Sequence, residues 1–460
     1  MRNPKKTTAK PKSKSSSKAK TNSAAMDTDA PSSSAPAVWR PGVDPLAEDE
    51  ELDYDPTAYD CLHRLQLDWP SLSFDIIKDD LGAPRSTFPH TMYMVAGTQA
   101  ENAKQNYLAF LRLEKLGQGR HGKKAKKEEE DDEDDDMSSE EDEVEEDDNG
   151  GEEPPKMHYR TVMNVGGINR VRTCPQQPGL VAVWVENGQV KLLDATKLLK
   201  ELSEETEPCN RQRAKADLRP LHSYTHTTEG FAVDWSPVKS GRLATGDCNN
   251  KIHVWEPQEG GRWQVSGAYN GHSGSVEDLQ WSPTEETVFA SCSVDKSIRV
   301  WDTRERTKPM ITVQAHDSDV NVISWNRLVS YMMASGADDG TLRIWDLRAL
   351  SQGNHVSHFA FHRGSVTSVE WCPYEGSMLA SAGEDNQLAV WDLALERDPE
   401  EEEALAPEGN AMAPEDLPAQ LLFLHAGQKD LKELHWHSQV PGVIASTAGD
   451  GFNVFKASNM

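Results

Sequence analysis

The chain has 460 residues, of which 36% are hydrophobic, and its formal net charge is −28. No run approaches 18 apolar residues, so we expect no membrane-spanning helix, and the first residues lack the apolar stretch of a secretory signal. A chain of this charge repels nucleic-acid phosphates, so we expect basic protein partners rather than direct sequence-specific binding of nucleic acid.

Residues 1–36 form a basic tail with almost no large apolar residue. Residues 1–26 contain eight Lys or Arg and no Asp or Glu. Such a segment cannot bury enough apolar surface to offset its ordering entropy, so it is predicted to be disordered. Its lysines, with the Lys-rich stretch 123–127, favour import into the nucleus and nucleolus.

Residues 37–120 regain large apolar residues and are predicted to hold an N-terminal α-helix and the first strands. Asp55-Pro56 is typical of a helix start, and Tyr59, Leu62 and Leu65 have partly helical spacing. These features predict a helix from 55 to 67 that packs in part against the folded body. The stretches TMYMVAGTQAE (91–101) and YLAFLRL (107–113) follow it as predicted strands.

Residues 121–156 form an acidic insert. Residues 128–153 alone carry 19 Asp and Glu and no Lys or Arg. The segment is predicted to be a disordered, solvated loop, and many exposed acids of this kind shield basic cargo from nucleic acid.

A repeat of about 45 residues dominates the segment 157–460. His272, His316 and His362 are 44 and 46 residues apart, and each lies 29 residues before a Trp-Asp pair. Three short apolar runs separated by turn residues lie inside each unit, for example SVEDLQWSP, FASCSVD and SIRVWD. This period is that of one four-stranded blade of a WD-repeat β-propeller.

Four residue types recur at fixed places in these units, namely His, Ser, Asp and Trp. In WD blades they form a chain of hydrogen bonds that fixes the register of the strands. An active site is needed once whereas these positions recur in every unit, so we interpret them as a structural network. The twelve residues are His272, Ser291, Asp295, Trp301, His316, Ser335, Asp339, Trp345, His362, Ser381, Asp385 and Trp391.

Weaker units at 166–194, 226–255 and 425–455 bring the number to six. The unit at 226–255 keeps His226, Thr245 and Trp255 and places Asn249 at the acid position. The strands near 91–113 and YRTVMNV (159–165) supply a seventh blade. We therefore predict an all-β, seven-bladed propeller in which the first and last segments meet to close the ring. A six-bladed ring with an appended N-terminal hairpin is the alternative.

Two segments resemble the histone-binding WD-repeat family of retinoblastoma-binding and chromatin-assembly-factor subunits. YDPTAYDCLHRLQLDWPSLSFDII (54–77) is similar to that family's N-terminal helix and first strand, and residues 414–452 are similar to its proline-containing loop and final blade. The resemblance is strongest to the glutamate-rich WD-repeat branch, through the acidic run before GGINRVR and through GDC, DVNVISW and DLKELHWH. It implies a chaperone that takes newly made universal large-subunit ribosomal protein 3 to pre-ribosomal particles.

The same resemblance implies a binding groove. In the histone-binding family the N-terminal helix and the loop before the last blade clamp a basic helical segment of the partner. The matching loop here is the acidic insert 396–418, although such a charge run is often only a solvated loop. The implied groove residues are Tyr59, Leu62, Leu65, Glu400, Glu401, Glu402, Glu403, Glu415 and Asp416.

Two alternatives to the ribosomal chaperone stay open: a histone-binding chromatin or replication factor, and a substrate receptor of a cullin-4 ubiquitin ligase. Arg304 and Arg348 complete W-D-x-R motifs like those that dock onto the ligase adaptor, although Arg is also common there for structural reasons. The six cysteines include no Cys-x-x-Cys pair, and there is no phosphate-binding Gly loop, metal-ligand spacing or nucleophile constellation. We therefore expect no enzyme activity, metal or cofactor.

Overall fold

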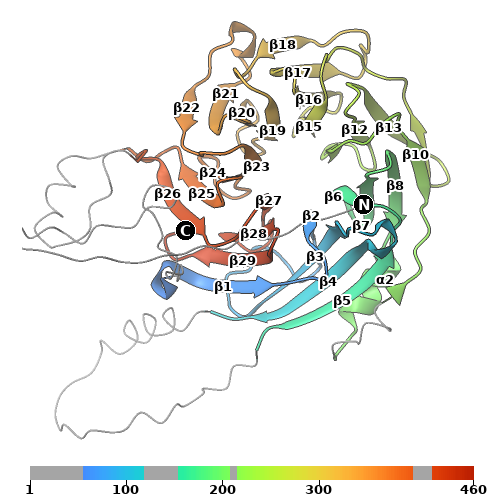
Figure 1. Cartoon of the computed structure of the whole chain (residues 1–460), viewed down its shortest axis with the longest axis vertical. Helices are drawn as coiled ribbons and strands as arrows, with labels where there is room; N and C mark the ends of the chain where they lie inside the picture. Colours follow the sequence, from blue (N-terminus) through green and yellow to red (C-terminus); the bar gives the residue numbers. More distant parts are fainter. Residues whose placement is uncertain (1–54, 119–153, 208–214, 397–416) are drawn as a thin grey trace, which may run out of the picture. The chain divides into compact units, whose positions relative to one another are not determined.

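The computed structural model describes residues 55–118, 154–207, 215–396 and 417–460. These residues form seven antiparallel sheets around a common axis, which are the blades of a propeller (Figure 1). The prediction of seven blades is confirmed, and the six-bladed alternative is wrong. The tail 1–36, nearly all of the acidic insert 121–156 and most of the acidic loop 396–418 lie outside the described residues.

Each blade has four main strands, and the first of each contacts the first strand of the next blade around the axis. The strands of blades 1 to 3 are β2 (Ser71–Ile77), β3 (His90–Thr98), β4 (Tyr107–Leu116), β5 (Lys156–Met163) and β9 (Lys215–Ala216); β6 (Ile168–Cys174), β7 (Gln177–Val185), β8 (Gln189–Asp194) and β10 (His222–Thr225); and β11 (Ala232–Trp235), β12 (Leu243–Gly246), β13 (Ile252–Gln258) and β14 (Arg262–Val265).

Blades 4 to 7 continue the same order along the chain. Their strands are β15 (Val276–Trp281), β16 (Val288–Ser293), β17 (Ser297–Asp302) and β18 (Ile311–Gln314); β19 (Val320–Trp325), β20 (Met332–Ala337), β21 (Thr341–Asp346) and β22 (Ser357–Ala360); β23 (Val366–Trp371), β24 (Met378–Gly383), β25 (Gln387–Asp392) and β26 (Leu421–Ala426); and β27 (Leu431–Trp436), β28 (Val443–Ala448), β29 (Gly451–Ala457) and β1 (Tyr59–Leu65).

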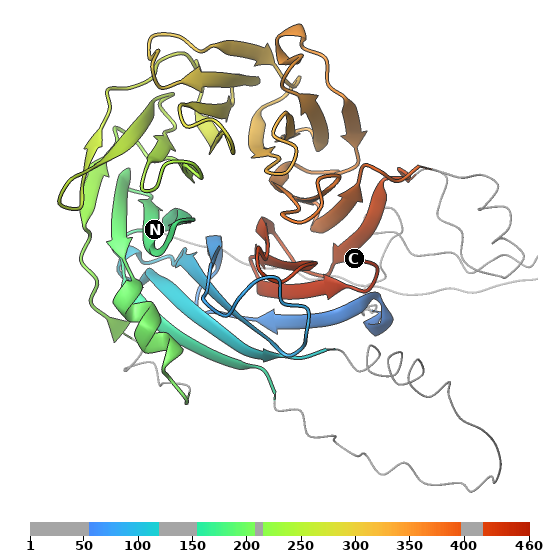
Figure 2. The same cartoon turned by 180° about the vertical axis from the view of Figure 1, so that it is seen from behind.

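Blade 7 closes the ring with strands from both ends of the chain. β1 pairs antiparallel with β29, so that Leu62 lies opposite Phe455. This pairing, visible from both sides of the molecule (Figures 1 and 2), confirms the expectation that the first and last segments meet. It also covers the edge of β29, which would otherwise expose unpaired backbone groups.

The helix predicted from 55 to 67 is wrong. Asp55 does accept a hydrogen bond from the Thr57 backbone N–H at 2.8 Å, but this start supports only the single 3-10 turn η1 (Pro56–Ala58). Residues 59–65 are extended because pairing with β29 supplies backbone hydrogen bonds and buries Tyr59 and Cys61. Tertiary pairing thus overrides the local helix signal.

Helices are short in the described ranges. They comprise α2 (Thr196–Ser203), η1, η2 (Ala103–Gln105) and η3 (Leu350–Gln352). No helix within those ranges is long and apolar enough to cross a membrane. α2 lies beside blades 1 and 2, and Leu198 and Leu202 form its buried face (Figure 2).

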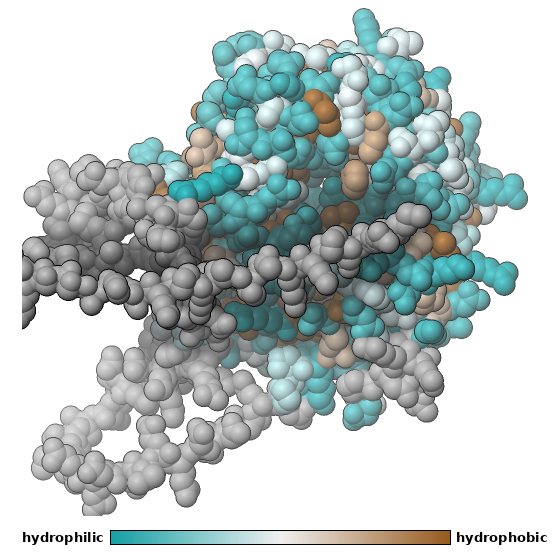
Figure 3. Space-filling model, viewed as in Figure 1, coloured by the Kyte–Doolittle hydropathy of each residue, from teal (hydrophilic) through white to brown (hydrophobic). Residues whose placement is uncertain are grey.

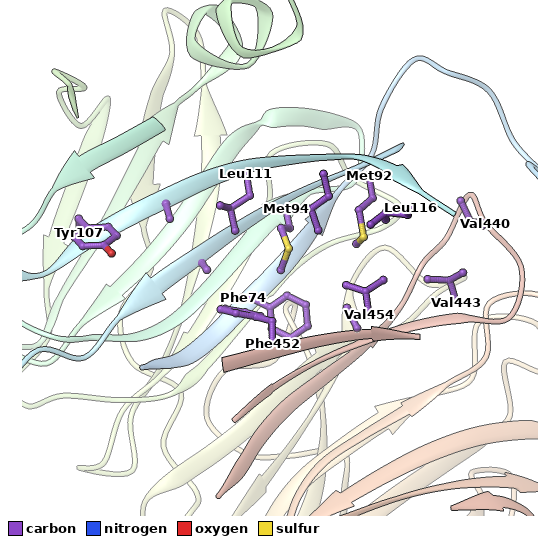
Figure 4. Close-up of a cluster of buried hydrophobic side chains, with 14 residues drawn as sticks. Phe74, Met92, Met94, Tyr107, Leu111, Leu116, Val440, Val443, Phe452 and Val454 are labelled. Carbon is purple, nitrogen blue, oxygen red and sulfur yellow. The ribbon is translucent and has the colours of Figure 1, made fainter. Parts of the chain in front are cut away.

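The hydrophobic core lies between neighbouring blades. At the junction of blades 1 and 7, Phe74, Met92 and Met94 pack against Phe452 and Val454 (Figure 4). Burying each such side chain contributes roughly 1.5–3 kcal/mol relative to leaving it in water. Because each blade covers its apolar faces only with its neighbours, the ring is stable as a whole.

Candidate functional site

The four recurrent residues of blade 4 form one hydrogen-bonded chain. The indole Nε1 of Trp301 donates to Ser291 Oγ at 2.9 Å, and this oxygen lies 2.7 Å from His272 Nε2. His272 Nδ1 lies 2.9 Å from Asp295 Oδ2. Since an indole can only donate, the Ser291 hydroxyl donates to Nε2 and His272 donates from Nδ1, so a neutral imidazole completes the chain.

The same geometry makes this group unsuited to catalysis. Burial lowers the pKa of His272, which keeps the ring neutral despite the nearby Asp295 carboxylate. The Ser291 side chain is fully buried and already engaged by Trp301 and His272, so no substrate reaches its hydroxyl. A Ser-His-Asp arrangement of this kind stabilises the blade.

Blades 5 and 6 repeat the chain with one difference. In blade 6, His362 contacts Asp385 at 3.1 Å and Ser381 at 2.7 Å, and Trp391 donates to Ser381. In blade 5, Trp345 and His316 again meet at Ser335. There, however, His316 Nδ1 contacts Thr341 Oγ1, which in turn donates to Asp339, so Asp339 is exposed and reaches the histidine only indirectly.

Blade 3 corrects one sequence assignment. His226 contacts Thr245 and Trp255 donates to Thr245, but the acid partner of His226 is Asp247 at 3.1 Å, not Asn249. Asn249 lies at the exposed tip of the turn. Asp247 precedes it by two residues, and its other oxygen accepts from the backbone of Asn249 and Lys251.

Blade 7 uses its histidine differently. His425 lies in β26, where Nδ1 contacts the Tyr59 hydroxyl at 2.7 Å and Nε2 contacts Asn453. The serine position of this blade, Ser446, is instead bonded to Gln428. His425 therefore joins blade 6 to the closing strands β1 and β29.

A second set of hydrogen bonds links the innermost strands of neighbouring blades around the channel. Each innermost strand is the edge of its own sheet, so its outward N–H groups have no ladder partner. Side chains of the adjacent blade accept from them: Ser73 from Val171, Asp75 from Thr173, Asp234 from Trp281, Asp278 from Ile323, Gln280 from Trp325, Ser324 from Trp371, Ser368 from Leu434, Glu370 from Trp436 and Glu433 from Phe74. Between blades 2 and 3, Arg170 Nε donates to Phe231 O instead.

Charged residues of the channel wall concentrate where blades 1, 2 and 7 meet. Glu433 Oε1 lies 2.6 Å from Arg170 and 2.7 Å from Arg172. Burial alone would raise the pKa of Glu433, but the two arginines hold it well below its usual range. Similarly, burial opposes the protonation of His435, yet Glu370 and Glu433 raise its pKa to about 10.

Elsewhere in the wall, burial raises the pKa of Asp234 to about 7. The sequence analysis missed this ring because its members differ from blade to blade. The available signal was positional: a polar residue stands immediately before Trp in each of SVEDLQWSP, DVNVISWNR and SVTSVEWCP.

The channel has two chemically different ends. We call the end where the innermost strands begin the upper end and the end where they finish the lower end; because neighbouring strands are antiparallel, loops between second and third strands also lie at the upper end. The described loops there carry four exposed basic residues and ten exposed acidic ones. The acidic residues are Asp68, Glu101, Glu186, Glu229, Asp317, Asp338, Asp339, Glu384, Asp430 and Asp450.

The lower end is balanced in charge and more apolar. Its described loops carry ten exposed residues of each sign. They also hold nine of the twelve large hydrophobic side chains exposed in the described ranges, namely Leu81, Leu221, Val238, Met310, Leu328, Tyr331, Val356, Tyr374 and Leu395. Hydrophilic residues, in contrast, cover most of the face drawn in Figure 3.

The groove predicted from the sequence is not assembled by the described residues. Tyr59 is buried against the last blade, and Leu62 and Leu65 are half-buried in β1 rather than on a helix. The acidic partners Glu400–Glu403, Glu415 and Asp416 lie outside the described residues. Tyr59 instead takes part in ring closure through His425.

The two W-D-x-R arginines lie at the lower end with exposed side chains. Each folds back onto the aspartate two residues earlier: Arg304 Nε lies 2.9 Å from Asp302 Oδ1, and Arg348 Nε lies 2.9 Å from Asp346 Oδ1. Arg348 also stacks over the ring of Tyr331. The local pairing explains these arginines without a partner.

Comparison with known proteins places the chain. The family model described as "WD domain, G-beta repeat" matches residues 263–302, 307–346 and 353–392, and the model of the histone-binding protein RBBP4 and the corresponding component of the CAF1 complex matches residues 49–116. Over 426 residues the chain is 55% identical to Glutamate-rich WD repeat-containing protein 1 of Dictyostelium discoideum, covering 92% of this chain and 85% of that protein. The chain belongs to the glutamate-rich WD-repeat protein family.

Other relatives of this glutamate-rich WD-repeat protein carry different names. Protein HEAT STRESS TOLERANT DWD 1 of Arabidopsis thaliana is 47% identical over 92% of both chains. Ribosome assembly protein rrb1 of Schizosaccharomyces pombe is 40% identical, over 91% of this chain and 84% of that protein. The crystal structure of the WD40 propeller of Doa1 has a TM-score of 0.53 at 14% identity, covering 88% of this chain and 97% of that one, which supports the fold alone.

Proposed function

We propose that this protein is a non-enzymatic scaffold and chaperone of ribosome biogenesis. Its client is a basic protein, universal large-subunit ribosomal protein 3, which it keeps soluble until the client reaches pre-ribosomal particles in the nucleus and nucleolus. The relative named Ribosome assembly protein rrb1 supports the process.

The acidic upper end of the channel carries the proposal. Ten exposed acids surround it, against four exposed bases, and they come from all seven blades. Asn169 lies within hydrogen-bonding distance of Glu229, and Ser365 donates to Asp338, so neighbouring blades hold some of these acids in place. A surface of this charge attracts basic proteins and raises their rate of encounter.

A solubility assay tests this function. Purified large-subunit ribosomal protein 3 is mixed with RNA, and its precipitation is followed by light scattering with and without the full-length protein. We expect an equimolar amount to suppress precipitation, because acidic groups compete with RNA phosphates for the same Lys and Arg. An acidic protein of similar charge without a propeller fold serves as the control. Equal suppression by that control would show that charge alone acts, and no suppression would contradict the proposal.

A histone chaperone is the second candidate. The family-model match at residues 49–116 favours it, since that model is described as a histone-binding protein. Competition distinguishes the two: histone H3–H4 and ribosomal protein 3 are titrated against the same labelled complex. The ribosomal function predicts tighter binding of ribosomal protein 3, and the reverse order would favour the histone function.

A further inference from the structure

A groove of about 810 Å³ lies at the lower end, across blades 1, 2 and 3. Its walls come from the loop after β2, from α2, from the segment before β10 and from β14. Ile77, Pro178 and Leu180 form an apolar floor, and Leu81, Leu199, Leu221 and Trp263 stand around it. Leu81 and Leu221 are 56% and 48% exposed, which is costly for two leucines unless something covers them.

The groove is built by elements that ordinary blade geometry does not require. α2 occupies the connection between the third and fourth strands of blade 2, where a short turn would join them. Leu198 and Leu202 anchor it, which turns Leu199 toward the groove. The indole N–H of Trp263 donates to Gly241 O at 2.7 Å, so this ring is held in place on the opposite wall.

The charges on the groove select against a strongly charged occupant. Lys78 and Asp80 lie on one wall, and Asp194 and Lys200 lie on the other, so each wall carries one charge of each sign. Asp79 is already paired with Arg85. A basic segment therefore gains little here compared with the upper end, whereas an apolar segment gains by covering Leu81 and Leu221.

The groove also adjoins the cavity at the lower end of the channel. Lys78 and Pro178 line both spaces. The channel cavity has about 360 Å³ and is walled by Asp75, Asp234 and Glu370 among other residues. A segment that leaves the groove past Pro178 therefore meets carboxylates at once, which suits an apolar stretch followed by a basic residue.

We propose that this groove is a second client site, which takes an apolar segment of the same client whose basic surface faces the acidic upper end. The inference rests on the proposed function for the identity of its occupant. An unassembled ribosomal protein exposes apolar surface as well as charge, and a chaperone with one acidic end and one apolar groove covers both.

Paired variants test the groove. In the full-length protein, Leu81→Ser with Leu221→Ser removes the two exposed leucines, and Val238→Ser with Met310→Ser removes two comparably exposed side chains elsewhere at the lower end, 44% and 58% exposed. Both are titrated with purified ribosomal protein 3 at low and high salt. We expect the groove variant to bind about tenfold more weakly, equivalent to about 1.4 kcal/mol, at both salt concentrations, and the control to bind like wild type.

Amide hydrogen exchange identifies the occupant. Addition of ribosomal protein 3 should slow exchange in residues 78–81, 196–203 and 261–263. If the client binds but both variants match wild type and exchange is unchanged, the groove proposal fails while the proposed function stands. If wild type does not bind the client at all, the proposed function fails and the occupant with it. Protection without client that is lost on dilution indicates a second copy, and concentration-independent protection indicates the chain's own N-terminal segment; either overturns the proposal.

Discussion

At the scale of single residues, recurrence in the sequence does not make the recurring side chains equivalent. Asp295 accepts from His272, Ser297 and the backbone of Ser273. Asp339 occupies the same place in the repeat, yet it is exposed and a threonine separates it from its histidine. The two aspartates therefore make different contributions to stability.

We predict that Asp295→Ala lowers the free energy of unfolding by about 1–3 kcal/mol, because the buried His272 loses its acceptor. Asp339→Ala should cost less than about 1 kcal/mol, since water can replace an exposed carboxylate. Urea denaturation of both variants measures the difference. Equal losses would show that exposure of the acid does not govern the strength of the network.

A second residue-level prediction concerns Tyr59, which the sequence analysis placed in the client groove. Tyr59→Phe removes the hydroxyl that contacts buried His425. We expect a loss of about 1–2 kcal/mol in the free energy of unfolding with unchanged binding of ribosomal protein 3. Weaker client binding at unchanged stability would restore Tyr59 to the binding surface.

At the scale of elements, the sequence predicts those features that repeat. Three full WD units made the blade period and the hydrogen-bonded residues of blades 4 and 6 legible, since a staple needed in every blade leaves a periodic trace. β1 could not be read in this way because its structure depends on β29, nearly 400 residues away along the chain. The channel wall was missed for a related reason, since its role requires a polar acceptor at each place but no particular residue.

The junction between blades 6, 7 and 1 gives a pH prediction. The pKa of His435 is about 10 in the fold and about 6.5 in an unfolded chain. A raised folded pKa stabilises the fold fully below about pH 6.5, and this contribution is lost as the pH rises through about 10. The free energy of unfolding should therefore fall between pH 7 and pH 10.

His435→Gln should make that fall shallower, and His358→Gln, at an exposed position in β22, should leave it unchanged. Urea titrations at a series of pH values provide the comparison. A fall of the same steepness in wild type and His435→Gln would show that the protonated imidazole does not hold these blades together.

At the scale of the whole molecule, the propeller separates charge from apolar surface. Exposed acids gather at the upper end, whereas exposed hydrophobic residues gather at the lower end, where the charges balance. The formal charge of −28 gives no hint of this division, because it sums over both ends and over the acidic insert. The fold alone brings seven separate loops together into one acidic surface.

The most direct test of this account compares neutralised variants of the two ends in binding ribosomal protein 3. The upper-end variant combines Glu229→Gln, Asp338→Asn and Glu384→Gln, and the lower-end control combines Glu285→Gln, Glu286→Gln and Glu375→Gln, so that each loses three exposed acids. Association rates are measured by stopped flow over a range of salt concentrations. We predict that the upper-end variant associates more slowly at low salt and shows a flatter salt dependence, and that the control behaves like wild type. Equal effects of the two variants, or no effect of either, would contradict the claim that the acidic upper end receives the basic client.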